Sequence, residues 1–233
     1  MESPSLSIFF PCYNDAKTIG DLITRADTVA SEFTDDYEII VVDDGSREGS
    51  QGVLEDLRSK FQKLRLIFHP KNLGYGAALH AGFFHATKDW IFYTDGDGQY
   101  DVLELRNLLP FTQNGVDLVN GYKIHRNDSW PRIIIGNLYQ WIARLLFHFT
   151  VRDLSCDFRL IRRRVFDRIQ LRHTSGAVCL ELVKKLEMSG FRSMDYPVHH
   201  YRRPHGKSQF FNVRSLSKTG LDIFQLWWEV KER

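Results

Sequence analysis

The chain has 233 residues, 43% of them hydrophobic and 26% charged, with a net charge of +2, which fits one large α/β domain with an ample core. No leader-like apolar stretch follows Met1 and no apolar run approaches the roughly 20 residues that span a bilayer, so we expect a cytoplasmic chain without a transmembrane helix. The scattered cysteines Cys12, Cys156 and Cys179 disfavour a disulfide framework or a zinc site and predict buried free thiols.

The charge is divided unevenly along the chain. Residues 1–121 hold 10 basic and 19 acidic residues, whereas residues 122–233 hold 21 and 10. Such a division suggests that the acidic half binds a metal and hydroxyl groups and that the basic half binds phosphates or an anionic surface. The alternative is that the two halves simply have differently charged solvated surfaces.

The first half of the chain alternates strand and helix patterns. Short apolar runs predict strands at residues 6–10, 38–42, 64–68 and 90–94. Apolar residues at helical spacing predict helices at residues 19–33, 53–61 and 77–86. This alternation predicts right-handed crossovers and an α/β fold with a doubly wound, mostly parallel sheet flanked by helices.

A polar cluster follows each of the four strands. The clusters are Tyr13-Asn14-Asp15, Asp43-Asp44-Gly45-Ser46, Asn72-Leu73-Gly74 and Asp95-Gly96-Asp97-Gly98-Gln99. In a doubly wound sheet, ligands bind beyond the carboxyl ends of the strands. We therefore expect the four strand ends to converge on one crevice.

The second half is less regular in pattern. It predicts a strand near residues 117–120, a helix over about 132–149, a segment at 156–164, a helix at 178–188, a hairpin at 193–201 and a final amphipathic helix at 216–230. Because no linker or repeat interrupts the chain, residues 1–233 are interpreted as a single domain.

The last cluster of the first half predicts a metal site. Asp95 and Asp97 lie two residues apart on a turn, and Gln99 adds an amide oxygen two residues further on. Hard oxygen ligands of this kind suit Mg²⁺ or Mn²⁺ and leave coordination positions for substrate phosphates. A polar turn with glycines is the alternative, but the preceding buried strand favours the metal site.

Taken in order, these motifs resemble family 2 glycosyltransferases of the GT-A fold over nearly the whole chain. The resemblance implies a nucleotide-diphospho-sugar donor, a bound Mg²⁺ or Mn²⁺, and transfer with inversion. It implies that Asp15, in place of the usual Glu, and Asp43 touch the base and ribose, which carboxylates do by accepting hydrogen bonds. The implied nucleotide-sugar site also includes Pro11, Tyr13, Asp44, Asn72, Gly74 and Asp95.

The second half resembles the branch of that family that glycosylates dolichyl or polyprenyl phosphate. The resemblance lies in Asp153 to Leu160 and in Arg202-Arg203-Pro204-His205-Gly206-Lys207. Arg202, Arg203 and Lys207 can form a cationic loop that grips a diphosphate or an acceptor phosphate, unless they form a solvated basic hairpin. We expect Asp157, Asp97 and Arg203 to be the catalytic residues, with Asp157 either orienting the acceptor or acting as a base.

These expectations divide the chain by function. Residues 1–121 form the donor and metal half, residues 122–212 the acceptor half, and residues 213–233 a C-terminal amphipathic helix. A lipid-phosphate acceptor implies peripheral contact with the cytoplasmic face of a membrane, through the aromatic stretches of the second half. The alternatives are a saccharide hydroxyl as acceptor, a sugar-nucleotidyltransferase, or a non-catalytic nucleotide-sugar binding module. No nucleic acid is expected as a partner.

Overall fold

The computed structural model describes residues 4–47, 49–124, 130–206 and 213–232. Its strands are β1 (Leu6–Cys12), β2 (Tyr37–Asp43), β3 (Leu64–Phe68), β4 (Trp90–Thr94), β5 (Leu118–Ile124), β6 (Phe158–Arg162) and β7 (Ser193–His199). Its α-helices are α1 (Ala16–Phe33), α2 (Ser50–Lys60), α3 (Tyr75–His85), α4 (Leu105–Leu108), α5 (Trp130–Phe147), α6 (Val178–Met188) and α7 (Val213–Lys231). Short 3-10 turns lie at η1 (Val102–Glu104), η2 (Leu109–Gln113) and η3 (Arg163–Asp167).

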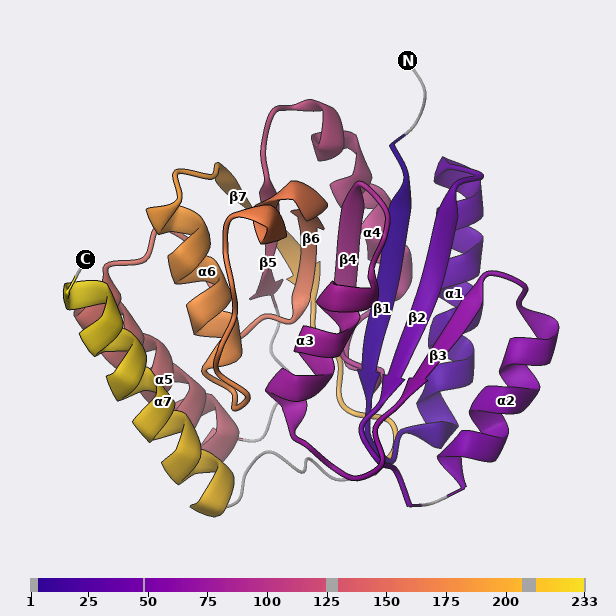
Figure 1. Cartoon of the computed structure of the whole chain (residues 1–233), viewed down its shortest axis with the longest axis horizontal. Coiled ribbons are helices and arrows are strands. Elements are labelled where there is room, and N and C mark those ends of the chain that lie inside the picture. The colour runs from indigo at the N-terminus through magenta and orange to yellow at the C-terminus, as the bar shows by residue number, and fades with distance from the viewer. Residues whose placement is uncertain (1–3, 48, 125–129, 207–212, 233) are drawn as a thin grey trace.

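The strands form one sheet in the order β3-β2-β1-β4-β6-β5-β7 (Figure 1). Only β6 runs against its neighbours, since it pairs antiparallel with both β4 and β5 while every other pair is parallel. The predicted α/β fold with a doubly wound, mostly parallel sheet flanked by helices is therefore confirmed. Strands from both halves of the chain join in this sheet.

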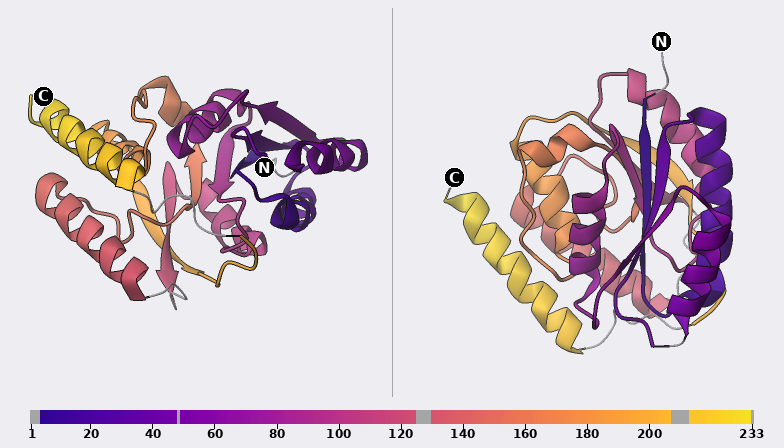
Figure 2. Two further views of the ribbon diagram at one scale, coloured as in Figure 1. Left: turned by 90° about the horizontal axis from the view of Figure 1, so that it is seen from below. Right: turned by 45° about the vertical axis from the view of Figure 1, so that its right-hand side comes forward.

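The central strands are buried on both faces. All residues of β1 and β2 are buried, as near-continuous apolar runs in a parallel sheet require. Ile8 and Phe10 point into the core under α1, whereas Phe9 packs in the second core against Phe83 of α3 and Tyr93 of β4. Helices thus cover both faces, and the loops at the strand ends remain available for a site (Figure 2).

The predicted hairpin at 193–201 is wrong. The segment forms the single edge strand β7, which pairs parallel with β5 along its whole length, from Leu118–Ser193 to Ile124–His199. Pro197 lies in the middle of this strand, and an edge strand tolerates a residue that cannot donate to the ladder. The helical turns at residues 102–113 were not predicted from the sequence either.

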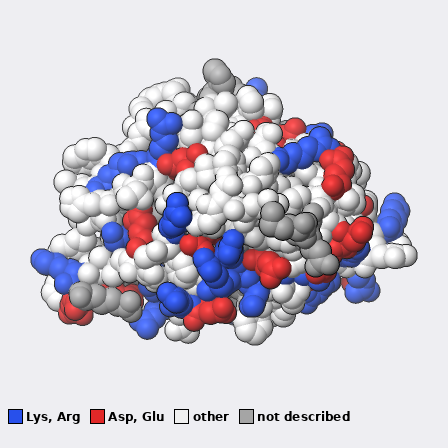
Figure 3. Space-filling view, turned by 90° about the horizontal axis from the view of Figure 1, so that it is seen from above, with Lys and Arg blue, Asp and Glu red and all other residues white. Residues whose placement is uncertain are grey.

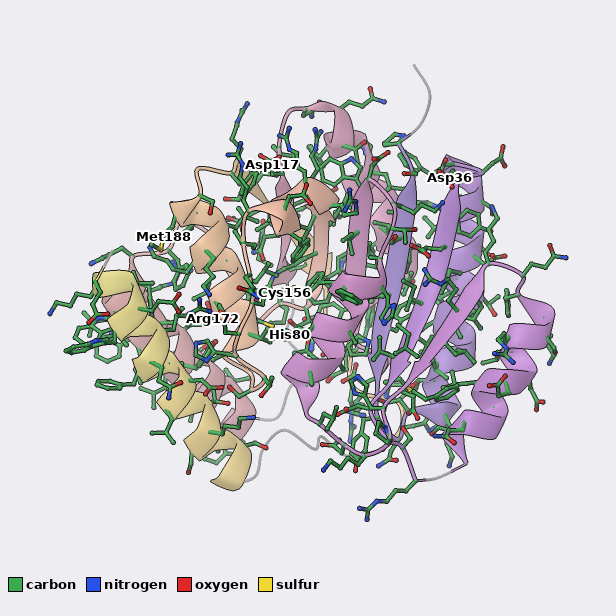
Figure 4. All side chains as sticks on the ribbon, viewed as in Figure 1. Asp36, His80, Asp117, Cys156, Arg172 and Met188 are labelled. Carbon is green, nitrogen blue, oxygen red and sulfur yellow. The ribbon has the colours of Figure 1, made fainter. Side chains whose placement is uncertain are left out.

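The edge of the sheet at the amino ends of most strands carries interspersed charges of both signs (Figure 3). Asp117, labelled at this edge in Figure 4, accepts hydrogen bonds from the Arg164 guanidinium, with its Oδ1 2.6 Å from Nη2. Arg162 stacks on the Trp90 ring. Some of the basic residues that give the second half its positive charge therefore contact other residues of the protein.

Glu38 anchors the start of β2 from inside the fold. Its carboxylate accepts hydrogen bonds from the Ser7 hydroxyl at 2.7 Å, from the Thr87 N–H at 2.7 Å and from the Arg65 guanidinium. Burial alone would raise the pKa of Glu38, but these donors outweigh it and lower the pKa below its ordinary value of 4.5. The ionised carboxylate therefore stabilises the fold.

We predict that Glu38→Gln lowers the free energy of unfolding by about 2 kcal/mol at neutral pH, because buried donors lose their charged acceptor. The lowered pKa means that the contribution is complete above pH 4.5 and declines as the pH falls through the folded-state pKa. Urea unfolding at neutral and acid pH measures both effects, with Glu55→Gln on the exposed face of α2 as the control. Equal stability of Glu38→Gln and the wild type at neutral pH would contradict this account.

Candidate active site

The carboxyl ends of β1, β2 and β4 meet because the three strands are parallel neighbours. The loops that follow them are joined by backbone hydrogen bonds, from the Asp44 N–H to the Cys12 carbonyl at 2.9 Å and from the Gly96 N–H to the Pro11 carbonyl at 3.1 Å. The predicted convergence of strand ends is thus present. Pro11, a predicted site residue, serves here as a buried backbone acceptor.

Two glycines allow the loops to approach this closely. Gly45 has a φ of 72°, and a Cβ there would lie 2.4 Å from the carbonyl carbon of Lys71. A Cβ on Gly96 would lie 2.8 Å from the carbonyl oxygen of Pro11. The glycines in the Asp43 and Asp95 clusters therefore bring neighbouring loops into contact.

Asp43 is fully buried and is bound to the first loop through one serine. The Ser46 hydroxyl donates to the Asp43 carboxylate and accepts from the Asn14 N–H at 2.9 Å. Asn14 has a φ of 58°, and its side-chain oxygen accepts from the Arg47 N–H at 2.9 Å. Asp43 therefore organises the loop on which Tyr13 and Asp15 lie.

Asp44 binds the loop between β3 and α3. Its carboxylate accepts from the Leu73 and Gly74 N–H groups, each at 2.9 Å, and lies 2.7 Å from His69 Nδ1. Asp44 is 3% exposed, so these donors surround a buried carboxylate. The structure thus gives Asp44 and Gly74 a shared role in shaping the loop, while Asn72 lies exposed beside them.

Asp95 lies at the centre of the acidic cluster with few donors. The Tyr75 hydroxyl donates to its Oδ1 at 2.9 Å. Burial, together with the negative charges of Asp157 and Asp97, raises the pKa of Asp95 well above its ordinary value. A positive charge placed here would relieve this repulsion.

Arg203 joins the two carboxylates beside Asp95. Its guanidinium donates to Asp15 Oδ1 at 2.5 Å and to Asp97 Oδ2 at 3.2 Å, bridging the first loop and the fourth. Burial raises the pKa of Asp15, and the nearby Arg203 charge offsets part of that effect. The predicted cationic loop therefore contacts the acidic cluster through Arg203.

Other cations of that loop differ from Arg203. Arg202 is exposed, and Lys207 lies outside the described residues. Gln99, the third predicted metal ligand, donates from Nε2 to the Tyr201 carbonyl at 3.1 Å. The backbone carbonyl of Gln99 accepts from the Tyr201 N–H at 2.8 Å. Gln99 thus fixes the start of the cationic loop, and its role as a metal ligand stays a prediction.

Asp157, from the second half of the chain, belongs to the same acidic cluster as Asp95. The Cys179 thiol donates to its Oδ1 at 3.1 Å, and an Arg159 nitrogen lies 3.7 Å from the same oxygen. The Asp157 side chain is 18% exposed. The second half of the chain therefore supplies a partly accessible carboxylate next to Asp95. The two carboxylates come from segments 62 residues apart in the sequence and meet because β6 pairs with β4.

Arg159 is a residue of this site that sequence reasoning did not select. It is fully buried and donates to Asn120 Oδ1 at 2.7 Å, to the Leu154 carbonyl at 2.8 Å and to the Tyr93 hydroxyl. Arg159 lies on β6, two residues after Asp157, and this spacing was the available signal in the sequence, because alternate residues of an extended chain face the same side. The sequence signal for Tyr75 was its position directly after Gly74, a predicted site residue. The sequence contained no signal for Cys179.

A shallow hollow of about 390 Å³ opens beside these loops. It is lined by the turn after β2 and by the segment after β3, namely Gly45, Ser46, Arg47, Gln51, Phe68, His69, Pro70, Lys71 and Asn72. Its size falls within the range of small-molecule sites. Because Ser46 lines the hollow and binds Asp43, the hollow adjoins the buried carboxylates.

The arrangement fits a divalent cation held by Asp95 and Asp97. Burial and the negative charges of Asp157 and Asp97 raise the pKa of Asp95, and the Arg203 guanidinium donates to Asp97 Oδ2 at 3.2 Å. Within the described residues, no group of three His, Cys, Asp or Glu side chains is placed to hold a metal.

The chain is similar to known proteins in both family and fold. Residues 7–170 match the family described as glycosyl transferase family 2. A mannosyltransferase from Pyrobaculum calidifontis, solved with GDP-mannose and Mn²⁺, has a TM-score of 0.69 at 19% identity over 97% of this chain, which spans 65% of that protein's length. Glucosyl-3-phosphoglycerate synthase from Mycobacterium tuberculosis, solved with Mn²⁺, UDP and glucosyl-3-phosphoglycerate, has a TM-score of 0.70 at 17% identity over 96% of this chain and 78% of its own. The same synthase has been solved with Mg²⁺ and UDP.

We predict that Arg203→Met raises the affinity for Mn²⁺ in the absence of nucleotide, because it removes the cation that competes for Asp97. The Arg203–Asp97 pair is mostly buried, and a loss of about 1 kcal/mol of competition corresponds to about fivefold tighter binding. Isothermal titration calorimetry measures the change, with Arg202→Met as the matched control. Unchanged or weaker Mn²⁺ binding by Arg203→Met would show that Arg203 does not occupy the metal site.

Proposed function

The chain belongs to glycosyl transferase family 2, and we propose that it transfers a hexose, with inversion, from a nucleotide-diphospho-sugar to a polyprenyl or dolichyl phosphate. The single observation that carries the proposal is the cluster of carboxylates at the strand ends, in which Arg203 bridges Asp15 and Asp97. A GDP-mannose or UDP-glucose type of donor is supported by the mannosyltransferase solved with GDP-mannose and by the synthase solved with UDP-glucose. The sugar-nucleotidyltransferase alternative loses its support, because the family match covers the motifs on which it would rest.

The donor site is supported by the loops that follow β1, β2 and β3. Asp43 and Asp15 offer carboxylate acceptors for the hydroxyl and ring N–H groups of a nucleoside, and the hollow beside Ser46 offers space for a flat ring. Asp44 contributes indirectly, since it holds the wall of this hollow through Leu73 and Gly74. The base therefore lies between the β2 turn and the segment after β3.

The leaving group is a diphosphate, and its charge must be stabilised as the sugar departs. Asp95 and Asp97 would hold the divalent ion, which supplies Lewis-acid stabilisation of the diphosphate when bound. Arg203 would leave Asp97 and donate to the phosphate oxygens, for which its planar fork of N–H groups is suited. Tyr75 keeps the Asp95 carboxylate oriented through its hydroxyl.

The acceptor approaches from the side of Asp157. A phosphate monoester has a second pKa of about 6, so its oxygen is already anionic near neutral pH and needs no strong base. Asp157, held by Cys179 and close to Arg159, would then orient the acceptor. A hydroxyl acceptor is the second candidate, because the partly exposed Asp157 could serve as its base.

A lipid-linked acceptor places the protein on the cytoplasmic face of a membrane as a peripheral protein. None of the helices in the described part of the chain is both long and apolar enough to cross a bilayer. The protein would therefore meet its acceptor from the surface.

The test is transfer by purified protein from GDP-mannose and UDP-glucose to a short-chain polyprenyl phosphate, with the free alcohol as the matched acceptor control. We expect transfer to the phosphate only, dependence on Mn²⁺ or Mg²⁺, and a loss of at least about a hundredfold in Asp97→Asn, since one metal ligand is neutralised. Ready transfer to a soluble saccharide, with no lipid phosphate used, would overturn the lipid-carrier proposal and leave the glycosyltransferase intact.

A further inference from the structure

The helices α5 and α7 lie side by side at the end of the molecule away from β3 and α2 (Figure 1). Seen from below, they form its outermost layer on that side (Figure 2). Three of the five tryptophans are exposed on these two helices, Trp130 by 73%, Trp141 by 62% and Trp228 by 53%. We call this surface the α5/α7 face; its other exposed apolar residues are Ile134, Ile135, Leu138, Leu145, Leu221 and Phe224.

The exposed residues form a stripe on each helix. On α5, Ile134, Leu138, Trp141 and Leu145 follow helical spacing, as Leu221, Phe224 and Trp228 do on α7. The opposite sides of the same helices are already used, since Ala143, Phe147 and Leu226 lie in the core. Each helix therefore has a second apolar side, beyond the one that folding buries.

The charges around the α5/α7 face are positive. Helix α5 contains Arg132 and Arg144 and no acidic residue, and the Arg144 guanidinium donates to the Val151 and Arg152 carbonyls. Helix α7 has two acidic residues, but Asp222 is 9% exposed and Glu229 lies 3.6 Å from the Lys185 ammonium. Lys218 and Lys231 are exposed on α7. The face is thus apolar and aromatic with a cationic border.

We propose that the α5/α7 face docks on the surface of an anionic lipid bilayer, with Trp141 and Trp228 inserted at the level of the headgroups. Tryptophan prefers that interface, and amphipathic helices with cationic borders lie in its plane. A second copy of the chain is the competing occupant. In a symmetric dimer the cationic borders of two copies would repel each other, since Asp222 is 9% exposed and Glu229 already lies 3.6 Å from Lys185, which disfavours that occupant.

The α5/α7 face is rigidly connected to the active site. The Lys218 ammonium donates to the Thr174 hydroxyl at 2.7 Å, and Asp222 lies 3.6 Å from His173 Nδ1. Arg172, labelled beside α6 in Figure 4, lies 3.7 Å from Glu229. The segment 172–174 therefore fixes α7 to the body of the protein.

The same segment also contacts the start of α3, next to the acidic cluster around Asp95. The Thr174 carbonyl accepts from the Gly76 N–H at 3.1 Å, and a Cβ on Gly76 would lie 2.5 Å from the carbonyl carbon of Thr174. Gly76 follows Tyr75, whose hydroxyl binds Asp95. Docking of the α5/α7 face would thus set the orientation of the acidic cluster relative to the lipid surface, an inference that rests on the proposed lipid-phosphate acceptor.

The experiment is co-flotation of the full chain with vesicles of phosphatidylcholine, with and without phosphatidylglycerol, together with quenching of tryptophan fluorescence by brominated phosphatidylcholine. We expect binding to the phosphatidylglycerol vesicles, weakened by salt, and quenching on binding. The double variant Trp141→Ser, Trp228→Ser should lower the partition coefficient by at least about tenfold, because two large aromatic side chains no longer insert. Phe84→Ser is the matched control, since Phe84 is 84% exposed on α3, outside the face.

Two results would overturn the proposal. One is unchanged vesicle binding by the double variant; the other is a stable wild-type dimer in sedimentation equilibrium that the double variant dissociates, which would assign the face to a second copy. Transfer to a water-soluble short-chain polyprenyl phosphate separates the two proposals. If the double variant retains this transfer but does not bind vesicles, both hold. If the wild type binds vesicles through the face but uses no lipid phosphate, only the acceptor proposal fails.

Discussion

Negative charge crowded at one edge of the sheet is the constraint on which this structure depends. Asp15, Asp43, Asp95, Asp97 and Asp157 lie on loops and strands that meet there, and each carboxylate must be stabilised or neutralised. Asp43 uses a serine hydroxyl, Asp15 and Asp97 share the Arg203 guanidinium, and Asp157 has Cys179 and Arg159. Asp95 has a tyrosine hydroxyl and two negative neighbours, so it is the carboxylate that most requires a cation.

This distribution separates the carboxylates by function. Those surrounded by hydrogen-bond donors, such as Asp44, shape the loops that line the hollow beside Ser46. Asp15 and Asp97 share an arginine from the loop after β7, and we propose that a metal replaces this arginine on Asp97. A guanidinium that moves from carboxylate to phosphate would couple donor binding to metal binding.

The sequence predicted the fold and the first half of the site because strand patterns and strand-end polar clusters are local signals. Asp95 and Asp97 follow β4 directly, and parallel neighbours must end at the same edge. The second half was harder to predict, since the meeting of Asp157 with Asp95 depends on the antiparallel β6, and the donors Tyr75 and Cys179 are recognised only by contact. The β7 hairpin was predicted wrongly because an edge strand with a proline has a pattern similar to that of a turn.

We propose that Asp95 and Asp97 bind a divalent ion and that Arg203 occupies its place beforehand. A crystal structure of the protein with Mn²⁺ and a nucleoside diphosphate, with the metal located by anomalous scattering, tests this directly. We expect Mn²⁺ bound to Asp97 and Asp95, and the Arg203 guanidinium turned from Asp97 to the diphosphate. Diphosphate bound with Arg203 still on Asp97, and no metal on either carboxylate, would contradict the proposal.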